Sequence, residues 1–171
     1  PRMLRSKDAP DEAQRHERVD RLIDRAICEV RQVLVDLRPT LLGEYGLAEA
    51  LDNELRNRRS AADGVQLRLD AATGLASQRW HPDVEYAAFM VAREAIGNAL
   101  AHAGASEVNV VLRGDARRLH LEVRDDGAGL RAEDRVVRPG HLGMIGMRER
   151  SVAIGAHFSA HSPEGGGTSV S

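Results

Sequence analysis

The chain has 171 residues, of which 42% are hydrophobic and 29% are charged, so it has room for one ordinary domain and an additional element. Its formal net charge of −2 and aromatic content of 3% argue against direct nucleic acid binding, because they indicate neither a basic surface nor a base-stacking one. The single cysteine excludes an internal disulfide and a multi-cysteine zinc site, and without a long apolar run or signal peptide the sequence predicts a soluble, cytoplasmic chain.

A long amphipathic helix is predicted over residues 11–37. Apolar residues recur there at alternating spacings of four and three, the pattern of a bundle helix. They are Val19, Ile23, Ala26, Val30, Val33 and Leu37. Pro39 ends the helix, because the residue before a proline is pushed out of helical geometry. The apolar seam predicts a homodimer formed through this helical region.

Downstream, the hydrophobic pattern becomes a mixture of helical and alternating segments. We predict helices over 47–59, 82–102 and 144–154, and strands over 65–69, 107–113, 118–125, 156–162 and 167–171. We also predict a compact turn over 41–47, a hairpin turn at 114–115 and a loop over 127–143. The chain is therefore expected to divide into an all-helical part, 1–60, and an α+β domain, 61–171.

The predicted helix over 82–102 carries two oxygen donors one turn apart. Glu94 and Asn98 are four residues apart and therefore point the same way. A carboxylate and an amide oxygen are hard donors that suit Mg²⁺, which takes its other ligands from water and phosphates. Arg93 and His102 flank the pair and are candidates for phosphate contacts. The alternative interpretation of all four is an ordinary polar helix face.

Three glycine-containing segments follow. Asp125-Asp126-Gly127-Ala128-Gly129 comes after an alternating strand, where a carboxylate suits the exocyclic amine of adenine and glycines let the backbone approach the base. Gly140 to Gly146 precedes a predicted helix, whose first N–H groups favour phosphates. Gly165-Gly166-Gly167-Thr168 is typical of a hairpin turn. Singly, these segments are equally an Asp-Gly turn, a surface loop and a hairpin. In this order, together with the helix, they indicate a purine nucleotide site.

The ordered set resembles the N box and the three glycine boxes of the GHKL ATP-binding fold. The matching residues are Glu94…Asn98, Asp125-x-Gly127-x-Gly129, Gly143-x-x-Gly146 and Gly167-Thr168. Two further segments, Asp36-Leu37-Arg38-Pro39 and Gly146-Met147-Arg148-Glu149-Arg150, resemble sensor histidine kinases of the NarX/DesK-like group, and the resemblance covers residues 15–171. It implies a GHKL (Bergerat-type) α/β sandwich of the α+β class. Its sheet would be mixed and mostly antiparallel, with helices on one face, and a long bundle helix would precede it.

The resemblance implies ATP and Mg²⁺ as cofactors and gives roles on the adenine side. Asp125 would receive the exocyclic amine of adenine. Gly127 and Gly129 would pass close to the base, and Thr168 would help to hold it.

The resemblance also gives roles on the phosphate side. Asn98 would bind Mg²⁺, and Glu94 would hold or assist a Mg²⁺-bound water. The histidine one turn after Asn98 would contact a phosphate. A lid over the phosphates would span 131–146, with Gly143 and Gly146 inside it.

In function, the resemblance implies the ATP-binding catalytic region of a two-component sensor histidine kinase. Such a protein transfers the γ-phosphoryl of ATP to a histidine, for relay to a response regulator of the NarL type. The family's acceptor histidine is followed by aspartate, whereas His16 is followed by Glu17 and Arg18. We therefore expect the acceptor helix to lie outside this chain.

Two alternatives differ in class. One is a non-catalytic GHKL binding module or pseudokinase, against which the intact Asn98, Asp125 and Gly127 argue. The other is a GHKL ATPase of the gyrase or MutL kind, in which Glu94 would activate water. A short lid argues against that ATPase, since 140–143 lacks the additional glycine that usually follows the histidine.

Overall fold

The computed structural model describes residues 40–60, 62, 64–130 and 142–171. They belong to one compact unit, Pro39–Ser171. The predicted bundle helix and most of the predicted lid lie outside the described residues. The chain divides between Arg38 and Pro39, earlier than the predicted boundary at residue 60, because 40–59 bury their apolar side chains in the same core as the α+β domain.

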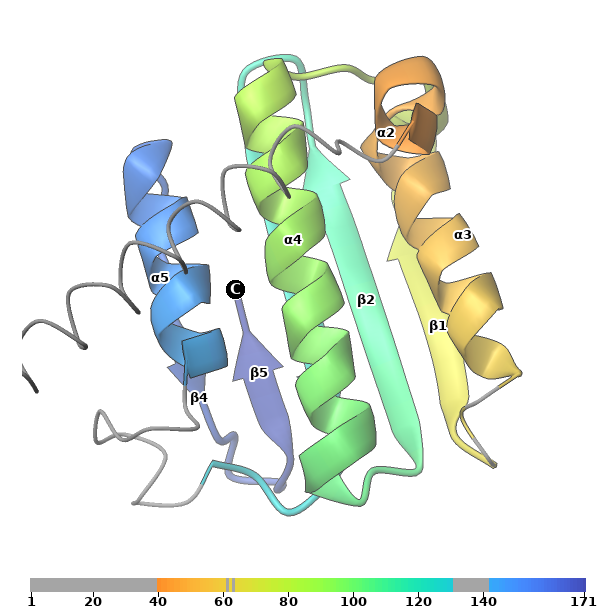
Figure 1. The fold of residues 1–171 in the computed structure, drawn as a ribbon, viewed down its shortest axis with the longest axis vertical. Coiled ribbons are helices and arrows are strands. Elements are labelled where there is room, and N and C mark those ends of the chain that lie inside the picture. Colours follow the sequence, from red (N-terminus) through yellow and green to blue (C-terminus); the bar gives the residue numbers. More distant parts are fainter. Residues whose placement is uncertain (1–39, 61, 63, 131–141) are drawn as a thin grey trace, which may run out of the picture. The chain divides into compact units, whose positions relative to one another are not determined.

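A five-stranded sheet forms one layer of this unit, in the order β1-β2-β3-β5-β4 (Figure 1). The strands are β1 (Gln66–Ala71), β2 (Glu107–Gly114), β3 (Leu119–Asp125), β4 (Ala160–His161) and β5 (Thr168–Val170). Strands β1 and β2 are parallel, and the other neighbouring pairs are antiparallel. The predicted mixed, mostly antiparallel sheet is confirmed.

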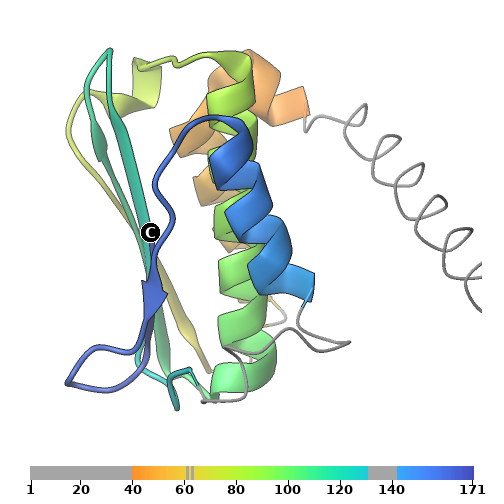
Figure 2. The same cartoon turned by 90° about the vertical axis from the view of Figure 1, so that its left-hand side faces the viewer.

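The described helices form the second layer, on one face of the sheet (Figure 2). They are α2 (Thr40–Tyr45), α3 (Leu47–Arg59), α4 (Pro82–Asn98) and α5 (Leu142–Ala153), with a 3₁₀ turn at Leu75–Ser77 and a π-helical turn at Ala99–Ala103 that continues α4. Helix α3 packs on β1, α4 packs on β3, and α5 lies beside α4 (Figure 1). The α/β sandwich is thus confirmed.

The core lies between the layers because the strands alternate. Val108, Val110 and Leu112 of β2 are fully buried and face the apolar side of α4. The strand register pairs Val108 with Asp125, and Asp125 with Thr168. Asp125 and Thr168 therefore lie in the same helix-facing row as Val108, at one end of the sheet.

The bounds or types of several predicted elements differ from the observed ones. The predicted turn over 41–47 contains helix α2, whose last carbonyls accept hydrogen bonds from the distant Arg79. The predicted strand over 156–162 is reduced to β4, because its neighbour β5 is itself short. Helix α5 begins at Leu142, two residues earlier than predicted, and Gly143 in its first turn lies against Glu94 of α4.

The described helices leave the other face of the sheet uncovered (Figure 2). Three arginine ion pairs of the described residues lie on that face. Arg68–Glu107 and Arg113–Asp70 join β1 to β2, and Arg124–Glu122 joins alternate residues of β3. The first two pairs are exposed and contribute little stability, whereas the Glu122 side chain is 13% exposed and also accepts from the Ser169 hydroxyl. None of the described helices has the length and apolar character required to cross a bilayer.

Candidate functional site

Three segments meet at one end of the fold, shown at the bottom of Figure 1. They are the end of β3, the end of α4 and the start of α5. Helix α4 runs toward this end, whereas β2, α5 and β5 run away from it, so β3, which is antiparallel to β2 and β5, ends here. Most of the sequence-predicted site residues are brought together here.

Glu94 and Asn98 lie near the C-terminal end of α4 and face the first turn of α5. A Cβ atom on Gly143 would overlap a carboxylate oxygen of Glu94 and would come within 3.4 Å of Asn98 Nδ2. Gly143 therefore allows α5 to approach both donors closely. Neither side chain is hydrogen bonded or ion-paired to another described residue, so their oxygens can serve a ligand.

Asp125 has one carboxylate oxygen fixed and one free. Oδ1 accepts hydrogen bonds from the backbone N–H groups of Gly127 at 2.9 Å and Thr168 at 3.2 Å. Oδ2 has no hydrogen-bond partner among the described residues. Because Oδ1 is held by two backbone groups, Oδ2 is presented in a defined direction, as a carboxylate that accepts from a ligand amine requires.

Asp126, the next residue, is fully engaged by the protein. Its Oδ1 accepts from the backbone N–H groups of Ser106 at 2.7 Å and Glu107 at 2.9 Å, and its Oδ2 accepts from the Ser106 hydroxyl. The Ser106 hydroxyl, and next the Glu107 N–H, hold the pKa of Asp126 below its ordinary value. Asp126 thus fastens the turn after β3 to the start of β2, and Asp125 is the carboxylate left for a ligand.

Gly127 and Gly129 lie where a side chain would not fit. A Cβ atom on Gly127 would overlap the carbonyl oxygen of Ala103, which also accepts from the Ala128 N–H at 2.9 Å. Gly129 has φ +76°, and its Cβ would come 2.8 Å from Ser162 Oγ. The turn after β3 is therefore packed between the π-helical turn and the β4–β5 hairpin, and glycine permits that approach.

The Gly167-Thr168 segment adjoins Asp125 directly. Thr168 pairs with Asp125 between β5 and β3. Gly167 has φ +77°, its N–H donates to the Gly127 carbonyl at 3.0 Å, and a Cβ there would overlap the Asp125 carbonyl oxygen. The glycine turn after β3 and the glycine turn before β5 are thus in direct contact.

His102 and Gly146 are less closely tied to this structure. His102 is exposed on the π-helical turn and makes no hydrogen bond or ion pair with another described residue. Gly146 is buried within α5, and the atoms nearest to a Cβ there belong to the Arg150 guanidinium, at 3.1 Å and beyond. The structure therefore places Gly143, and not Gly146, against Glu94 and Asn98.

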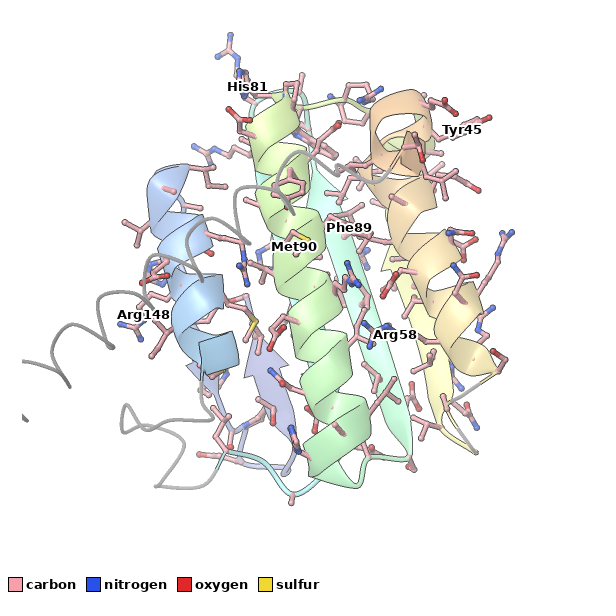
Figure 3. The ribbon with its side chains drawn as sticks, in the orientation of Figure 1. Tyr45, Arg58, His81, Phe89, Met90 and Arg148 are labelled. Carbon is pink, nitrogen blue, oxygen red and sulfur yellow. The ribbon has the colours of Figure 1, made fainter. Side chains whose placement is uncertain are left out.

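Arg93 faces a different neighbour. Its Nε lies 3.8 Å from Glu54 Oε1 on α3, and its carbonyl accepts from Arg58 at 3.3 Å. Arg58 lies between α3 and α4 (Figure 3) and donates to Glu54 at 2.6 Å. Arg93 therefore belongs to the α3–α4 contact, and the interpretation as an ordinary polar surface residue describes it best.

Sequence reasoning missed the residues that shape the site without facing a ligand, namely Ser106, Asp126, Ala103 and Ser162. One signal was available for Asp126. Asp125 has the parity of the buried Val123 in β3 and must face the helices, whereas Asp126 follows the strand end. Ala103 and Ser162 are joined to the turn by packing between distant segments, which no local pattern marks.

The donor set fits a nucleotide with a divalent cation. Within the described part of the chain, no three His, Cys, Asp or Glu side chains lie close enough to hold a metal ion. Glu94 and Asn98 would supply two protein oxygens, and phosphates and water would complete the coordination that Mg²⁺ prefers. The first turn of α5 adds backbone N–H groups that favour phosphate. The arrangement therefore suits an amine-bearing ring at Asp125 and phosphates near α5.

Comparison with known proteins agrees with this geometry. The profile of the family described as "Histidine kinase-, DNA gyrase B-, and HSP90-like ATPase" matches residues 83–171. The chain is 28% identical over 170 residues to the oxygen sensor histidine kinase NreB of Staphylococcus carnosus (strain TM300), a match that covers 99% of this chain and 48% of that protein. The chain thus spans about half the length of that relative. Together the two matches confirm the resemblance to NarX/DesK-like sensor histidine kinases.

Solved structures of histidine kinases share the fold. The blue-light activated histidine kinase EL346 of Erythrobacter litoralis superposes with a TM-score of 0.59 at 21% identity, over 72% of this chain and 40% of that one. The histidine kinase AdeS of Acinetobacter baumannii superposes with a TM-score of 0.56 at 18% identity, over 71% and 60% of the two chains. At these identities the likeness establishes the GHKL fold and nothing further.

Proposed function

The chain belongs to the family of histidine kinase-, DNA gyrase B- and HSP90-like ATPases, and on that premise we propose that it is the ATP-binding catalytic region of a two-component sensor histidine kinase. It binds ATP with Mg²⁺ and transfers the γ-phosphoryl group to a histidine, from which a response regulator of the NarL type receives it. The observation that carries this proposal is the half-engaged carboxylate of Asp125, at the same end of the fold as Glu94 and Asn98.

Adenine recognition rests on Asp125. Its Oδ1 is held by the Gly127 and Thr168 N–H groups, and its Oδ2 accepts a hydrogen bond from the exocyclic amine. Thr168 and the turn that contains Gly127 and Gly129 frame the position of the base, and the two glycines let that turn pack against Ala103 and Ser162. A site built to accept from an amine rejects a purine that lacks one, because the carboxylate oxygen would then be left without a partner.

The phosphate side rests on α4 and α5. Asn98 would hold Mg²⁺ through its amide oxygen, and Glu94 would hold a water bound to the ion. Bound Mg²⁺ neutralises charge on the phosphates, which is the main electrostatic requirement of phosphoryl transfer. Gly143 keeps the first turn of α5 close to both side chains, and His102, exposed on the π-helical turn that follows Asn98, contacts a phosphate.

We further propose that the intact protein acts in the cytoplasm as a homodimer, joined through the region that precedes α2. The histidine kinase names of the relatives support a response regulator as the partner. The dimer prediction rests on the apolar seam of the sequence over 19–37.

The proposal is tested by calorimetric titration of ATP, with and without Mg²⁺, into the wild-type chain and two adjacent variants. We expect Asp125→Asn to weaken ATP binding about 10- to 100-fold, because it turns the acceptor of a charge-assisted hydrogen bond into a donor. Asp126→Asn is the matched control and should bind ATP as the wild type does, since its oxygens face Ser106 and Glu107. No binding by the folded wild-type chain, or an equal loss in both variants, would contradict the nucleotide site.

Incubation of the intact protein with γ-labelled ATP separates the classes of function. A phosphorylated histidine that is stable in base and labile in acid supports the kinase. ATP binding without transfer of label supports the non-catalytic binding module, and release of inorganic phosphate that depends on Glu94 supports the ATPase.

A further inference from the structure

Helix α4 carries a buried carboxylate, Glu85, which the nucleotide site does not use. It lies near the opposite end of the helix and is 1% exposed. Its Oε1 accepts from Arg79 Nε and from the Trp80 backbone N–H, both at 2.9 Å, and its Oε2 accepts from Arg79 Nη2 at 2.9 Å. The two bonds from Arg79 are parallel, so the guanidinium and the carboxylate are joined at two points.

Arg79 uses its remaining donors on helix α2. Nη1 donates to the Gly43 carbonyl at 3.2 Å, and Nη2 donates to the Leu42 carbonyl at 3.3 Å. These carbonyls lie in the last turns of a six-residue helix, and the Leu42 carbonyl also accepts from the Gly46 backbone N–H at 3.2 Å. Helix α2 is too short to be stable alone, so Arg79 supplies part of what holds it.

The turn after α2 is shaped around the same side chain. Gly46 has φ +87°, and a Cβ atom there would come 3.1 Å from Arg79 Cδ. Arg79 therefore joins three segments: the end of α2, the strand-to-helix connection at 78–80 and the first turns of α4. In Figure 3 this junction is at the end of the molecule where Tyr45 and His81 are labelled, opposite the nucleotide site.

Helix α2 is the first element of the unit that holds the nucleotide site, so this junction bears on how the preceding segment is attached. The chain divides into compact units between Arg38 and Pro39, and α2 begins at Thr40. Every segment that precedes the catalytic unit is therefore connected to it through α2. A side chain that fixes α2 on α4 fixes the point from which the preceding segment leaves the catalytic unit.

We propose that Arg79 is a positioning residue for phosphoryl transfer, which holds the connector helix α2 on the catalytic unit through Glu85 and so sets the approach of the acceptor-bearing part of the protein to ATP. This inference rests on the proposed kinase function. Arg79 touches neither nucleotide nor acceptor, so its loss leaves ATP affinity intact and slows transfer. A displacement of about 1 Å between reacting groups costs on the order of 100-fold in rate, so a loosened connector has a measurable effect.

The geometry requires arginine and not merely a positive charge. A lysine ammonium cannot make two parallel bonds to Glu85 while also donating to two carbonyls of α2. Arg79→Lys should therefore behave like Arg79→Ala in transfer, although it keeps the charge beside Glu85. Arg113→Ala is the matched control, since Arg113 also pairs with a carboxylate, Asp70, and its side chain is 41% exposed against 45% for Arg79.

The test uses the intact kinase and these three variants, well below the melting temperature of each. Three quantities are measured: the dissociation constant of Mg-ATP, the initial rate of autophosphorylation at saturating ATP, and amide hydrogen exchange in 40–46. For both Arg79 variants we expect an unchanged dissociation constant, a rate at least about tenfold lower, and exchange in α2 at least about tenfold faster. Arg113→Ala should match the wild type in all three.

Each other result overturns the inference. Faster exchange with an unchanged rate would make Arg79 a purely structural residue. Unchanged exchange would show that Arg79 does not hold α2. A wild-type protein that binds ATP but forms no phosphohistidine would remove the kinase proposal, and this inference with it. If the wild type transfers phosphate normally, a failure of the Arg79 variants to slow transfer overturns this inference alone. Should Arg79→Ala fail to fold, Arg79→Lys gives the same readings.

Discussion

Helix α4 carries one glutamate near each end. Glu85 is buried and Glu94 is half-buried, and the two differ in their hydrogen bonds. At the N-terminal end, both oxygens of Glu85 accept hydrogen bonds, from Arg79 and from the Trp80 N–H. At the C-terminal end, Glu94 lies against Gly143 and has no hydrogen-bond partner among the described residues. Both are glutamates of one helix that covers one sheet.

Glu85 stabilises the fold through its hydrogen bonds, whereas the oxygens of Glu94 remain available to a ligand. Glu94 and Asp125 are only half-buried, so their unpartnered oxygens are accessible to water in the free protein and to a ligand that replaces it. The same contrast divides Asp125, whose Oδ2 is free, from Asp126, whose two oxygens are bound by Ser106 and Glu107. Engaged carboxylates determine where the elements lie, and the free ones determine what binds.

The largest effect should come from closing the gap between α5 and Glu94. In Gly143→Ala, the new Cβ would overlap the Glu94 carboxylate, so α5 or Glu94 must move. We expect Mg-ATP affinity to fall about 100-fold, because the donors on α4 are displaced relative to the phosphates. Gly97→Ala on α4 is the control, since its Cβ would meet Arg58 at 3.4 Å, an ordinary contact. It should retain ATP binding, and a normal affinity for Gly143→Ala would contradict the placement of the metal donors. Isothermal titration measures both variants.

Next in size is the loss of stability on crowding Asp125 from β5. Gly167→Ala combines φ +77° with an overlap on the Asp125 carbonyl. We expect the free energy of unfolding to fall by about 2 kcal/mol, measured by urea denaturation. Gly165→Ala, two residues away, meets nothing within 4 Å and should unfold as the wild type does. Equal stability of the two variants would show that the turn is not packed on Asp125 as described.

Exchanging the two glutamates of α4 for glutamine tests the contrast between them in one experiment. Glu85→Gln should lower the melting temperature by about 5–10 °C, since it removes the buried charge that pairs with the half-exposed Arg79, and should leave ATP affinity unchanged. Glu94→Gln should melt as the wild type does. The factor by which Mg²⁺ increases its ATP affinity should be about tenfold smaller. Scanning calorimetry with and without Mg-ATP reads both quantities. If both variants lose stability and neither loses affinity, the two carboxylates do not differ in role.

The smallest effect concerns acid stability. The hydrogen bonds from Ser106 and Glu107 hold the pKa of Asp126 below the value of about 4 that it has in an unfolded chain. Its contribution to stability is therefore complete above about pH 4 and is lost as the pH falls through the lowered folded pKa. Asp126→Asn should flatten the decline of the unfolding free energy below about pH 4, with no change in slope between pH 6 and 8. An identical acid decline in both proteins would show that Asp126 contributes nothing to it.

Much of this fold follows from periodicity in the sequence. The alternating segments that became β2 and β3 and the helical run that became α4 carry their own signal, because one face of each is buried. The parity of Asp125 with Val123 is enough to place Asp125 on the helix-facing side of the sheet. These parts depend on local pattern alone.

The remainder depends on contacts between distant segments. The last carbonyls of helix α2 accept from Arg79, 36 residues after Gly43. Gly143 begins α5 against Glu94, whose carboxylate a Cβ at position 143 would overlap. The approach of Gly127 to Ala103 depends on the π-helical turn, which no spacing marks. The predicted bundle helix, and the predicted lid up to residue 141, stay predictions.

The division between engaged and free carboxylates is tested most directly by a crystal structure of this chain with Mg²⁺ and a non-hydrolysable ATP analogue. We expect the exocyclic amine of adenine to donate to Asp125 Oδ2, the Asn98 amide oxygen to coordinate Mg²⁺, and Asp126 to keep its bonds to Ser106 and Glu107. An adenine held by Asp126, or a nucleotide bound away from Asp125 and Asn98, would contradict that division.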